Sequence, residues 1–260
     1  MRIVINADDF GLNHDVNMAI VEAFEKGYIT NTTIMANMPG FEEAVSLSKE
    51  HGFFEKVGLH FNIFEGYPLS EKMKEASLFI EDGEMTSFKF FHQSSFREKL
   101  PSPFSSKCLQ EAIKDEALKQ VDRYLRAGFS EMHFDSHGHS HTFPVVWCSI
   151  KDIFVKNGFK TVRKSLNFPK PTLLKRVYKD TYNYLLAKSF SSTQYFASGS
   201  GFLSSAHKLK GIDSLEIMVH PVYDEATGVL RNSGKNPNFE SIMGKIREMG
   251  DVDLIGYNTL

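Results

Sequence analysis

Short apolar runs alternate along this chain with longer segments in which apolar residues recur every three or four positions. The short runs are rich in β-branched and aromatic residues, which favours β-strands, whereas the longer segments have the spacing of one buried helix face. Strands are expected at residues 2–7, 32–38, 57–63, 161–163, 193–197, 215–221 and 252–256, and in the segment that begins at His133. Helices are expected at residues 16–24, 41–51, 108–127, 143–157, 173–190 and 239–249.

This alternation predicts an α/β fold whose parallel strands are joined by right-handed crossovers. About seven strands fit a closed or partly closed, somewhat irregular (β/α) barrel best, and a doubly wound open sheet is the second choice. Asp15 is the expected N-cap of the first helix. Residues 65–105 interrupt the pattern, and we interpret them as an irregular insertion that is either a surface excursion or a lid. The chain has no internal repeat and no linker, so residues 1–260 are expected to form one domain.

The overall composition excludes several classes of protein. The chain is 42% hydrophobic and 24% charged, as in ordinary globular proteins, and its net charge of −2 gives no reason to expect binding to nucleic acid or to an anionic membrane. No apolar run approaches membrane-spanning length, and the N-terminal segment lacks the apolar core of a signal peptide. Cys108 and Cys148 show no metal-binding spacing, so we expect two free thiols in a cytoplasmic protein.

The densest group of reactive side chains lies between His133 and His141. This segment holds four of the ten histidines. On an extended backbone alternate side chains share a face, which would place five of its residues together: His133, Asp135, His137, His139 and His141. A solvated His-rich loop and buried, hydrogen-bonded histidines are the alternatives. Neutral imidazoles and carboxylates are ligands of divalent metals, and the density of such groups here favours a metal site.

Other reactive residues lie at the expected ends of strands. They are Asp8 and Asp9 after the first strand, His60 in the third, Arg163 after residues 161–163, and His220 before Pro221. In an α/β barrel or an open α/β sheet, ligands bind beyond the carboxyl ends of the strands. Taken singly, a buried structural histidine is the ordinary reading of His60, a strand terminator that of His220-Pro221, and a plain surface arginine that of Arg163.

Together these residues can support hydrolysis. One carboxylate and two imidazoles make a metal site with open positions, and a bound metal acidifies water and polarises a carbonyl. A second carboxylate can then act as general base, and His220 can protonate the leaving group. Arg163 can keep a neighbouring carboxylate ionised. This chemistry suits an amide, an ester or a phosphate, and the sequence does not separate the roles of Asp8 and Asp9.

At four blocks of residues the chain resembles the YdjC-like carbohydrate deacetylases, which include the chitooligosaccharide deacetylases. The blocks are Asn6-Ala7-Asp8-Asp9-Phe10-Gly11, Gly58-Leu59-His60-Phe61-Asn62 with Glu65-Gly66-Tyr67-Pro68, the segment from His133 to His141, and Val219-His220-Pro221. The resemblance implies a barrel akin to that of polysaccharide deacetylases and a bound divalent metal, with Mg²⁺ expected first and Zn²⁺, Mn²⁺ or Co²⁺ as alternatives. It also implies one catalytic domain that removes acetyl groups from N-acetylated sugars or oligosaccharides.

The resemblance also implies residue roles. His60 and His137 would bind the metal with Asp9, while Asp8 would be the base and Arg163 the residue that orients it. The acid is not part of this resemblance: from the residues alone we expect His220, or else His139 or His141, to protonate the departing amine. At position 64 the chain has Phe64, where the resemblance leads us to expect a threonine and a more polar rim.

Rival hypotheses are a metal-dependent phosphoesterase, another amidohydrolase, and a sugar- or metal-binding protein without turnover. A phosphoesterase would need more Lys or Arg near the site than Arg163 and Lys164. A glycosidase is disfavoured because it needs paired carboxylates and no metal. The abundance of Phe, 23 residues, suits a core and a sugar-binding cleft, and the aromatic residues at 85–96 suggest a homodimer.

Overall fold

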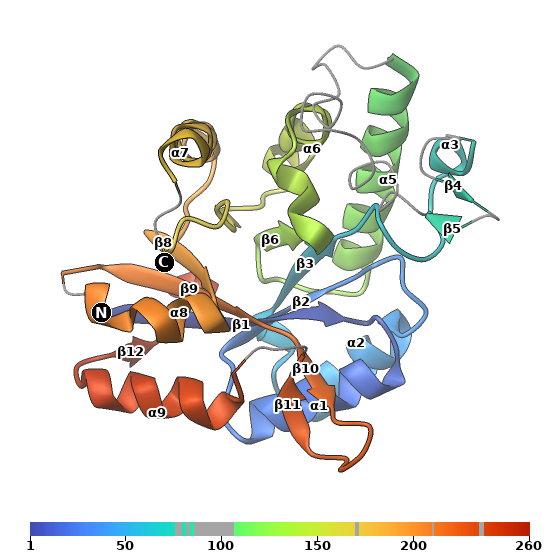
Figure 1. The fold of residues 1–260 in the computed structure, drawn as a ribbon. Helices are drawn as coiled ribbons and strands as arrows, with labels where there is room; N and C mark the ends of the chain where they lie inside the picture. Colours follow the sequence, from blue (N-terminus) through green and yellow to red (C-terminus); the bar gives the residue numbers. More distant parts are fainter. Residues whose placement is uncertain (76–79, 82–83, 86–106, 170–171, 210, 234–236) are drawn as a thin grey trace.

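The computed structural model describes residues 1–75, 80–81, 84–85, 107–169, 172–209, 211–233 and 237–260. Its centre is a parallel sheet of seven strands in the order β7-β6-β3-β2-β1-β9-β8, with β12 pairing alongside β1 (Figure 1). The strands are β1 (Arg2–Phe10), β2 (Asn31–Ile34), β3 (Val57–Phe61), β6 (His133–Ser136), β7 (Thr161–Val162), β8 (Tyr195–Ser198), β9 (Ser214–Val219) and β12 (Asp253–Leu254).

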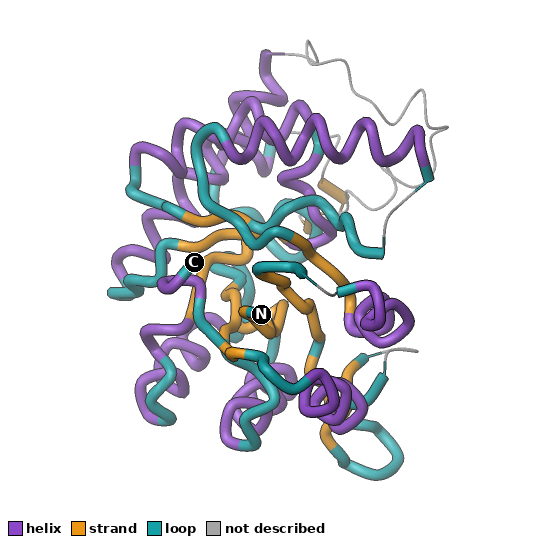
Figure 2. The backbone as a smooth tube through the Cα atoms, turned by 90° about the vertical axis from the view of Figure 1, so that its left-hand side faces the viewer, coloured by secondary structure: helices purple, strands orange, loops and turns teal. Residues whose placement is uncertain are grey.

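The sheet curls into a partly closed barrel, which confirms the predicted fold class (Figure 2). Its two edge strands approach one another where they begin. Thr161 of β7 forms a parallel bridge with Ser191, four residues before β8, and the Ser191 amide donates to the Lys160 carbonyl at 2.9 Å. All strand pairs of this sheet are parallel, so the carboxyl ends of the strands lie at one end of the barrel.

Helices surround the strands and agree closely with the expected segments (Figure 1). They are α1 (His14–Glu25), α2 (Phe41–Glu50), α5 (Lys107–Arg126), α6 (Pro144–Lys156), α7 (Leu173–Ala187) and α9 (Phe239–Met249). The predicted cap of the first helix was wrong. Asn13 is the N-cap and its Oδ1 accepts from the Val16 amide at 3.0 Å, whereas Asp15 lies in the first turn. Asn13 precedes the helix in an extended conformation, which a capping residue requires.

Several short elements have no clear signal in the sequence. They are α3 (Glu71–Lys74), α8 (Gly199–Ser205), the hairpins β4 (Ile80–Glu81) with β5 (Glu84–Met85) and β10 (Pro221–Tyr223) with β11 (Leu230–Asn232), and the 3₁₀ turns η1 (Phe54–Lys56), η2 (His137–Thr142), η3 (Ala206–Lys208) and η4 (Tyr257–Thr259). Elements of two to seven residues are too short to show a period. The predicted insertion at 65–105 includes α3, β4 and β5, and most of its aromatic residues lie outside the described part of the chain.

The core lies between the sheet and the surrounding helices, and phenylalanines fill much of it. Phe134 of β6 stacks on Phe154 of α6 with 3.8 Å between the ring centroids, and Phe190 and Phe159 contact Phe134 edge-on. This packing holds β6 rigidly, and β6 carries residues of the candidate site. Among the described residues, no helix has the length and apolar character needed to cross a membrane.

Candidate metal centre

A break in the regular pairing of β1 brings two adjacent carboxylates to the same site. The register between β1 and β2 shifts between Ala7 and Phe10, and Asp9 has a φ of 71°. Such a bulge re-aims a side chain, and a positive φ is uncommon for a non-glycine residue outside functional sites. Asp8 therefore points into the barrel interior, toward Arg163, while Asp9 points to two histidines. The sequence placed both carboxylates after the first strand but did not indicate this bulge.

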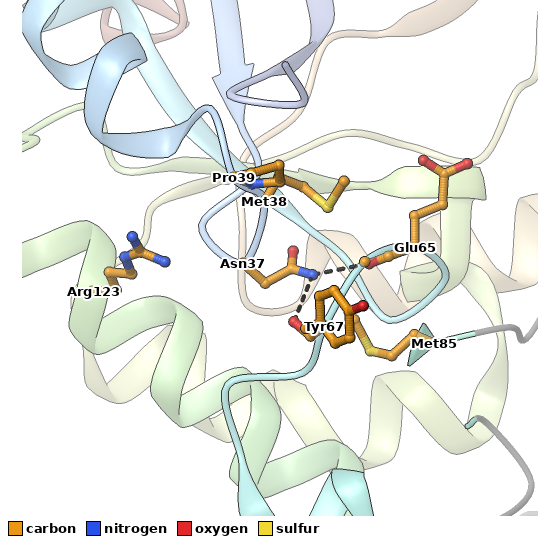
Figure 3. A pocket seen from close by; sticks show the side chains of 8 residues that line it. Asn37, Met38, Pro39, Glu65, Tyr67, Met85 and Arg123 are labelled. Carbon is orange, nitrogen blue, oxygen red and sulfur yellow. Dashed lines mark hydrogen bonds between the residues drawn. The ribbon is translucent and has the colours of Figure 1, made fainter. Parts of the chain in front are cut away.

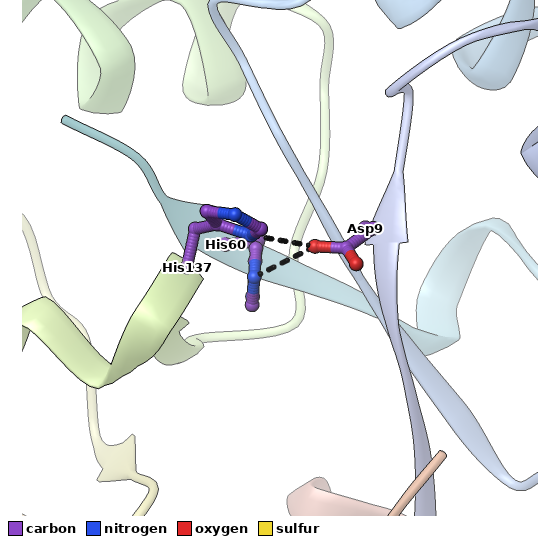
Figure 4. Close-up of side chains that lie close together, drawn as sticks. All are labelled: Asp9, His60 and His137. Carbon is purple, nitrogen blue, oxygen red and sulfur yellow. Dashed lines mark hydrogen bonds and ion pairs between the residues drawn. The ribbon is translucent and has the colours of Figure 1, made fainter. Parts of the chain in front are cut away.

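Asp9, His60 and His137 converge at the carboxyl ends of β1, β3 and β6 (Figure 4). Asp9 Oδ1 lies 3.2 Å from His60 Nε2 and 2.8 Å from His137 Nδ1, and a ligand atom of each residue lies within 4.8 Å of the others. The other ring nitrogen of His60 lies 2.6 Å from Asp135 Oδ1, which orients the ring and directs Nε2 at the cluster. One carboxylate and two oriented imidazoles fit a divalent metal.

The charges around this cluster favour a cation. Burial lowers the pKa of His60, but Asp135 and Asp9 outweigh burial and raise it to about 10. Burial also opposes protonation of His137, yet its hydrogen bonds to Asp9 and Glu65 raise the pKa to about 9. Protons and a metal ion therefore compete for the same nitrogen atoms, and metal binding is expected to release protons.

Below the cluster, Arg163 is fully buried among three carboxylates. Its Nη1 and Nη2 donate to the two oxygens of Asp8, each at 2.6 Å. Its Nη1 also lies 2.8 Å from Asp135 Oδ2, and its Nε donates to Glu216 Oε1 at 2.5 Å. Burial raises the pKa of Asp8, but the charge and hydrogen bonds of Arg163 hold it well below the usual value. Asp8 is thus ionised and fixed in orientation.

His220 faces both carboxylates of the bulge from the end of β9. Its Nε2 lies 3.9 Å from Asp8 Oδ2 and 3.8 Å from Asp9 Oδ2, and 28% of its side chain is exposed. The His220 amide donates to Asn232 Oδ1 of β11 at 2.8 Å. Pro221 begins β10, so the His-Pro pair does end β9, and the hairpin that follows also holds the imidazole beside the cluster.

The five alternate residues from His133 to His141 do not share one face, so that prediction was wrong. β6 ends at Ser136, and the chain then turns through η2, where Gly138 and His139 have φ values of 58° and 55°. Alternation holds only while β6 pairs with β3, that is, as far as Ser136. Of the four histidines in this segment, His137 alone reaches the metal cluster.

The other three histidines lie outside this cluster. His133 stacks on Tyr257, and its Nδ1 lies 3.0 Å from Thr161 Oγ1. His141 Nε2 donates to the Arg163 carbonyl at 3.0 Å, so it fixes the backbone of that arginine. His139 packs edge-on against Phe196. Burial lowers the pKa of His139 and of His141 to about 3, so both are neutral.

Some residues of the site were missed by reasoning from sequence. They are Asn6, which donates to Asp8 Oδ1 at 2.9 Å, Thr33, which donates to Asp135 Oδ2 at 3.1 Å, Glu216, Glu65, and Asp135 in its role as the partner of His60. The available signal was polarity inside apolar strands. Asn6 stands between Ile5 and Ala7, and Glu216 stands between Leu215 and Ile217.

Phe64, which stands where we expected a threonine, does not form an apolar part of the rim. Its side chain is buried, with 6% exposure, and packs against the η2 turn. A Cβ atom on Gly138 would lie 2.6 Å from the Phe64 ring. Glycine is therefore favoured at position 138 for two reasons: the backbone there has a positive φ, and the Phe64 ring leaves no room for a Cβ atom.

The protein is thus an α/β barrel in which one carboxylate and two histidines, a group that could bind a metal ion, lie at the carboxyl ends of the strands. A family profile described as YdjC-like protein matches residues 2–250, so the chain belongs to this family. It is 33% identical over 231 residues to a carbohydrate deacetylase of Brevibacillus brevis, covering 87% of this chain and 84% of the relative. A carbohydrate deacetylase of Clostridium beijerinckii is 30% identical over 227 residues, covering 86% and 82%.

A solved structure supports the fold. It is a protein of Enterococcus faecalis V583, provisionally described as a cellobiose-phosphate cleavage protein, with a TM-score of 0.72. The match covers 99% of this chain and 98% of that one, at 21% sequence identity. At this identity the likeness concerns the fold alone.

Proposed function

We propose that this chain is a metal-dependent carbohydrate deacetylase that hydrolyses the acetamide of N-acetylated sugars or oligosaccharides. The carbohydrate deacetylases among its relatives support the reaction class. The single observation that carries the proposal is the convergence of Asp9, His60 and His137 beside the pair formed by Asp8 and His220. The whole chain, residues 1–260, would act as one catalytic domain.

The residues of the site divide the work of amide hydrolysis. A divalent metal held by Asp9, His60 and His137 would polarise the acetyl carbonyl and acidify the attacking water. Asp8 accepts the proton that the water loses, while Arg163 keeps the carboxylate ionised and aligned. As the C–N bond breaks, His220 donates a proton to the sugar nitrogen. Acetate and a free amino sugar are the products.

The finer features are also proposals. Mg²⁺ is the metal we expect first, with Zn²⁺, Mn²⁺ and Co²⁺ as alternatives, and short chitooligosaccharides are the expected substrates. Cys108 and Cys148 are free and exposed, which suits the reducing conditions expected of the cytoplasm. A homodimer stays a prediction, because most of the aromatic segment that suggested it lies outside the described residues. Light scattering that finds a monomer alone would exclude the dimer.

The arrangement of cations disfavours a phosphoesterase. Arg163 is engaged by three carboxylates, and burial of Lys164 lowers its pKa. Neither residue is therefore well suited to a phosphate group, which needs an accessible positive charge. A deacetylase needs no such cation.

The proposed function is tested by acetate release from N-acetylglucosamine and N,N′-diacetylchitobiose. Metal-stripped protein is assayed after each of the four metals is added back, and calorimetry measures metal binding. We expect metal-dependent release that His60→Ala and His137→Ala reduce at least about 100-fold, because each removes one ligand. His207→Ala, which changes an exposed histidine of η3, is the control and should leave activity unchanged. Metal binding without acetate release from either sugar contradicts the proposal.

A further inference from the structure

The barrel has a cavity at the end opposite to the metal centre. The cavity beside the centre, of about 630 Å³, is lined by Glu65, whose carboxylate lies 3.6 Å from His137 Nε2 (Figure 3). A smaller cavity of about 270 Å³ lies where β2, β3 and β6 begin and where the chain passes from β12 into η4. Its walls include Thr30, Asn31, Lys56, Glu131, Gly256 and Asn258. None of these residues takes part in the proposed reaction.

Asn31, the first residue of β2, has a buried oxygen without a partner. The side chain is fully buried, and its Nδ2 donates to the Lys56 carbonyl at 3.3 Å. Its Oδ1 accepts no hydrogen bond from the residues that the structure describes. A buried polar atom without a partner costs free energy, so such an atom indicates a bound water or ion. Because Asn31 lines the cavity, this oxygen is available to what binds there.

Glu131 adds a buried negative charge to the same cavity. The residue is 5% exposed, and burial raises the pKa of its carboxyl to about 7. A hydrogen bond from the Asn258 backbone opposes this rise, and the charge of Glu55 adds to it. Lys56 lines the cavity as well, but no cationic residue in the described ranges forms an ion pair with Glu131. A carboxylate buried to this degree is expected to have a cation as its partner.

Gly256 leaves space beside two amide oxygens. A Cβ atom on this residue would lie 3.0 Å from Asn258 Oδ1 and 3.3 Å from Asn31 Oδ1. The backbone of Gly256 is extended, with a φ of −95°, so its conformation does not require glycine. The missing side chain therefore matters for the space that it leaves. Together with the Glu131 carboxylate, the two amide oxygens form a donor set made of oxygen alone, which hard cations prefer.

We propose that this cavity binds a hard cation, either an alkali ion or Ca²⁺, through Glu131, Asn31 Oδ1 and Asn258 Oδ1. The ion neutralises the carboxylate and gives the Asn31 oxygen a partner. It also joins the beginning of β2 and the segment before β6 to the C-terminal segment. There Tyr257 precedes Asn258 and stacks on His133 of β6, so the ion helps to hold this ring in place. The site is structural and does not depend on the proposed function.

Thermal unfolding at about pH 8, where Glu131 is ionised, tests the proposal. Metal-stripped protein is compared in potassium, sodium, calcium and choline chloride at equal ionic strength. Choline is the reference, because its methylated nitrogen cannot be coordinated directly by oxygen atoms. At least one inorganic cation should raise Tm by about 2–4 °C over choline, the shift expected for a ligand present at several times its Kd. Glu131→Gln removes the charge and Gly256→Ala fills the space, so each should abolish this increase.

Two control variants should keep the response to the cation. Gly244→Ala makes the same substitution on α9, where a Cβ atom would meet nothing closer than 4.0 Å. Asp9→Asn removes a proposed ligand of the metal centre, so a response that persists there is independent of the proposed function. Equal Tm values in all four salts overturn the proposal, and a lower Tm in Lys56→Gln would then assign Glu131 to that lysine. A response that Asp9→Asn abolishes and Glu131→Gln retains also overturns it.

Crystals provide a readout that does not depend on stability. They are soaked in rubidium chloride if an alkali ion stabilises the protein, or in strontium chloride if Ca²⁺ does. Anomalous scattering should then locate the ion within coordination distance of Glu131 and Asn31. An anomalous signal at the metal centre alone, with only water in the smaller cavity, rejects the site.

Discussion

The site has two parts that differ in how their polar atoms are used. The buried charge layer comprises Asp8, Asp135, Arg163 and Glu216, whose side chains are at most 3% exposed. The open rim comprises Asp9, His137, His220 and Glu65, whose side chains are between 14% and 44% exposed. In the buried charge layer one guanidinium binds three carboxylates at 2.5–2.8 Å, whereas His220 lies 3.8 Å or more from its acidic neighbours.

This difference indicates that the buried charge layer mainly fixes geometry and charge, whereas the open rim mainly binds ligands. Atoms that are saturated with short hydrogen bonds inside a protein cannot easily take a new ligand, but they fix geometry and charge. Atoms at the rim retain the capacity to bind a metal or a substrate. Asp8 and Asp9 are adjacent in sequence yet belong to different parts. Asp8 is the exception within the buried charge layer: Arg163 holds it, but its Oδ2 lies 3.9 Å from His220 Nε2 and is the atom that the proposed function uses as the base. If the two parts are separate, substitutions in the buried charge layer and at the open rim should change different properties of the protein.

The largest expected effect is on activity. Asp8→Asn should lower kcat by about 10²- to 10⁴-fold, because the amide cannot accept a proton from water, while metal affinity measured by calorimetry should hardly change. Asp9→Asn is the matched variant at the rim and should weaken metal binding. Retained turnover in Asp8→Asn would mean that Asp8 only positions its neighbours. Loss of metal binding in that variant, with metal binding retained in Asp9→Asn, would reverse the two roles.

The next effect is on stability. Arg163→Met should lower the free energy of unfolding of the metal-free protein by about 3–5 kcal/mol, because it leaves buried carboxylates without their cation. His137→Ala at the rim should cost about 1 kcal/mol or less, because its ion pairs are partly exposed. Urea denaturation of both variants and the wild type measures this contrast. Similar losses in the two variants would show that the buried charge layer is not a separate structural unit.

The smallest effect concerns pH. Burial raises the pKa of Glu216 to about 7, although Arg163 opposes the shift. Since the ordinary value is 4.5, the folded state binds the extra proton between about pH 4.5 and 7, and this contribution to stability is lost as pH rises through that range. Glu216→Gln keeps the hydrogen-bond acceptor for Arg163 and should remove about 1–3 kcal/mol of this pH dependence.

Unfolding of the wild type and of Glu216→Gln should therefore be followed by urea denaturation from pH 5 to pH 8. Glu240→Gln on α9, where the residue is exposed, serves as the control. An unchanged pH slope in Glu216→Gln would assign the proton to another member of the buried charge layer.

The sequence was sufficient for the parts of the fold that depend on periodicity. The spacing at 239–249 predicted α9 with its observed bounds, and the apolar runs placed the main parallel strands. The rule that sites lie beyond strand ends then placed all six candidate residues at one end of the barrel. Such rules work because hydrophobic burial and strand direction are set by local pattern.

The sequence was insufficient where one residue changes the path of the backbone. Alternation along an extended strand predicted one face shared by alternate residues from His133 to His141, but β6 ends at Ser136 and the chain turns at Gly138. The bulge at Asp9 depends on the pairing of β1 with β2, which local pattern does not contain. Glu216 could not be matched to Arg163, because their pairing depends on how distant strands are brought together.

The contact between Phe64 and Gly138 also bears on how this chain can vary over generations. A Cβ at position 138 would lie 2.6 Å from the Phe64 ring, so a substitution there requires the ring to move as well as a strained backbone. A smaller residue at position 64, such as threonine, would open space for a Cβ at 138 while leaving its backbone requirement in place. A change at position 138 is therefore expected to be tolerated better after a change at position 64 than before it.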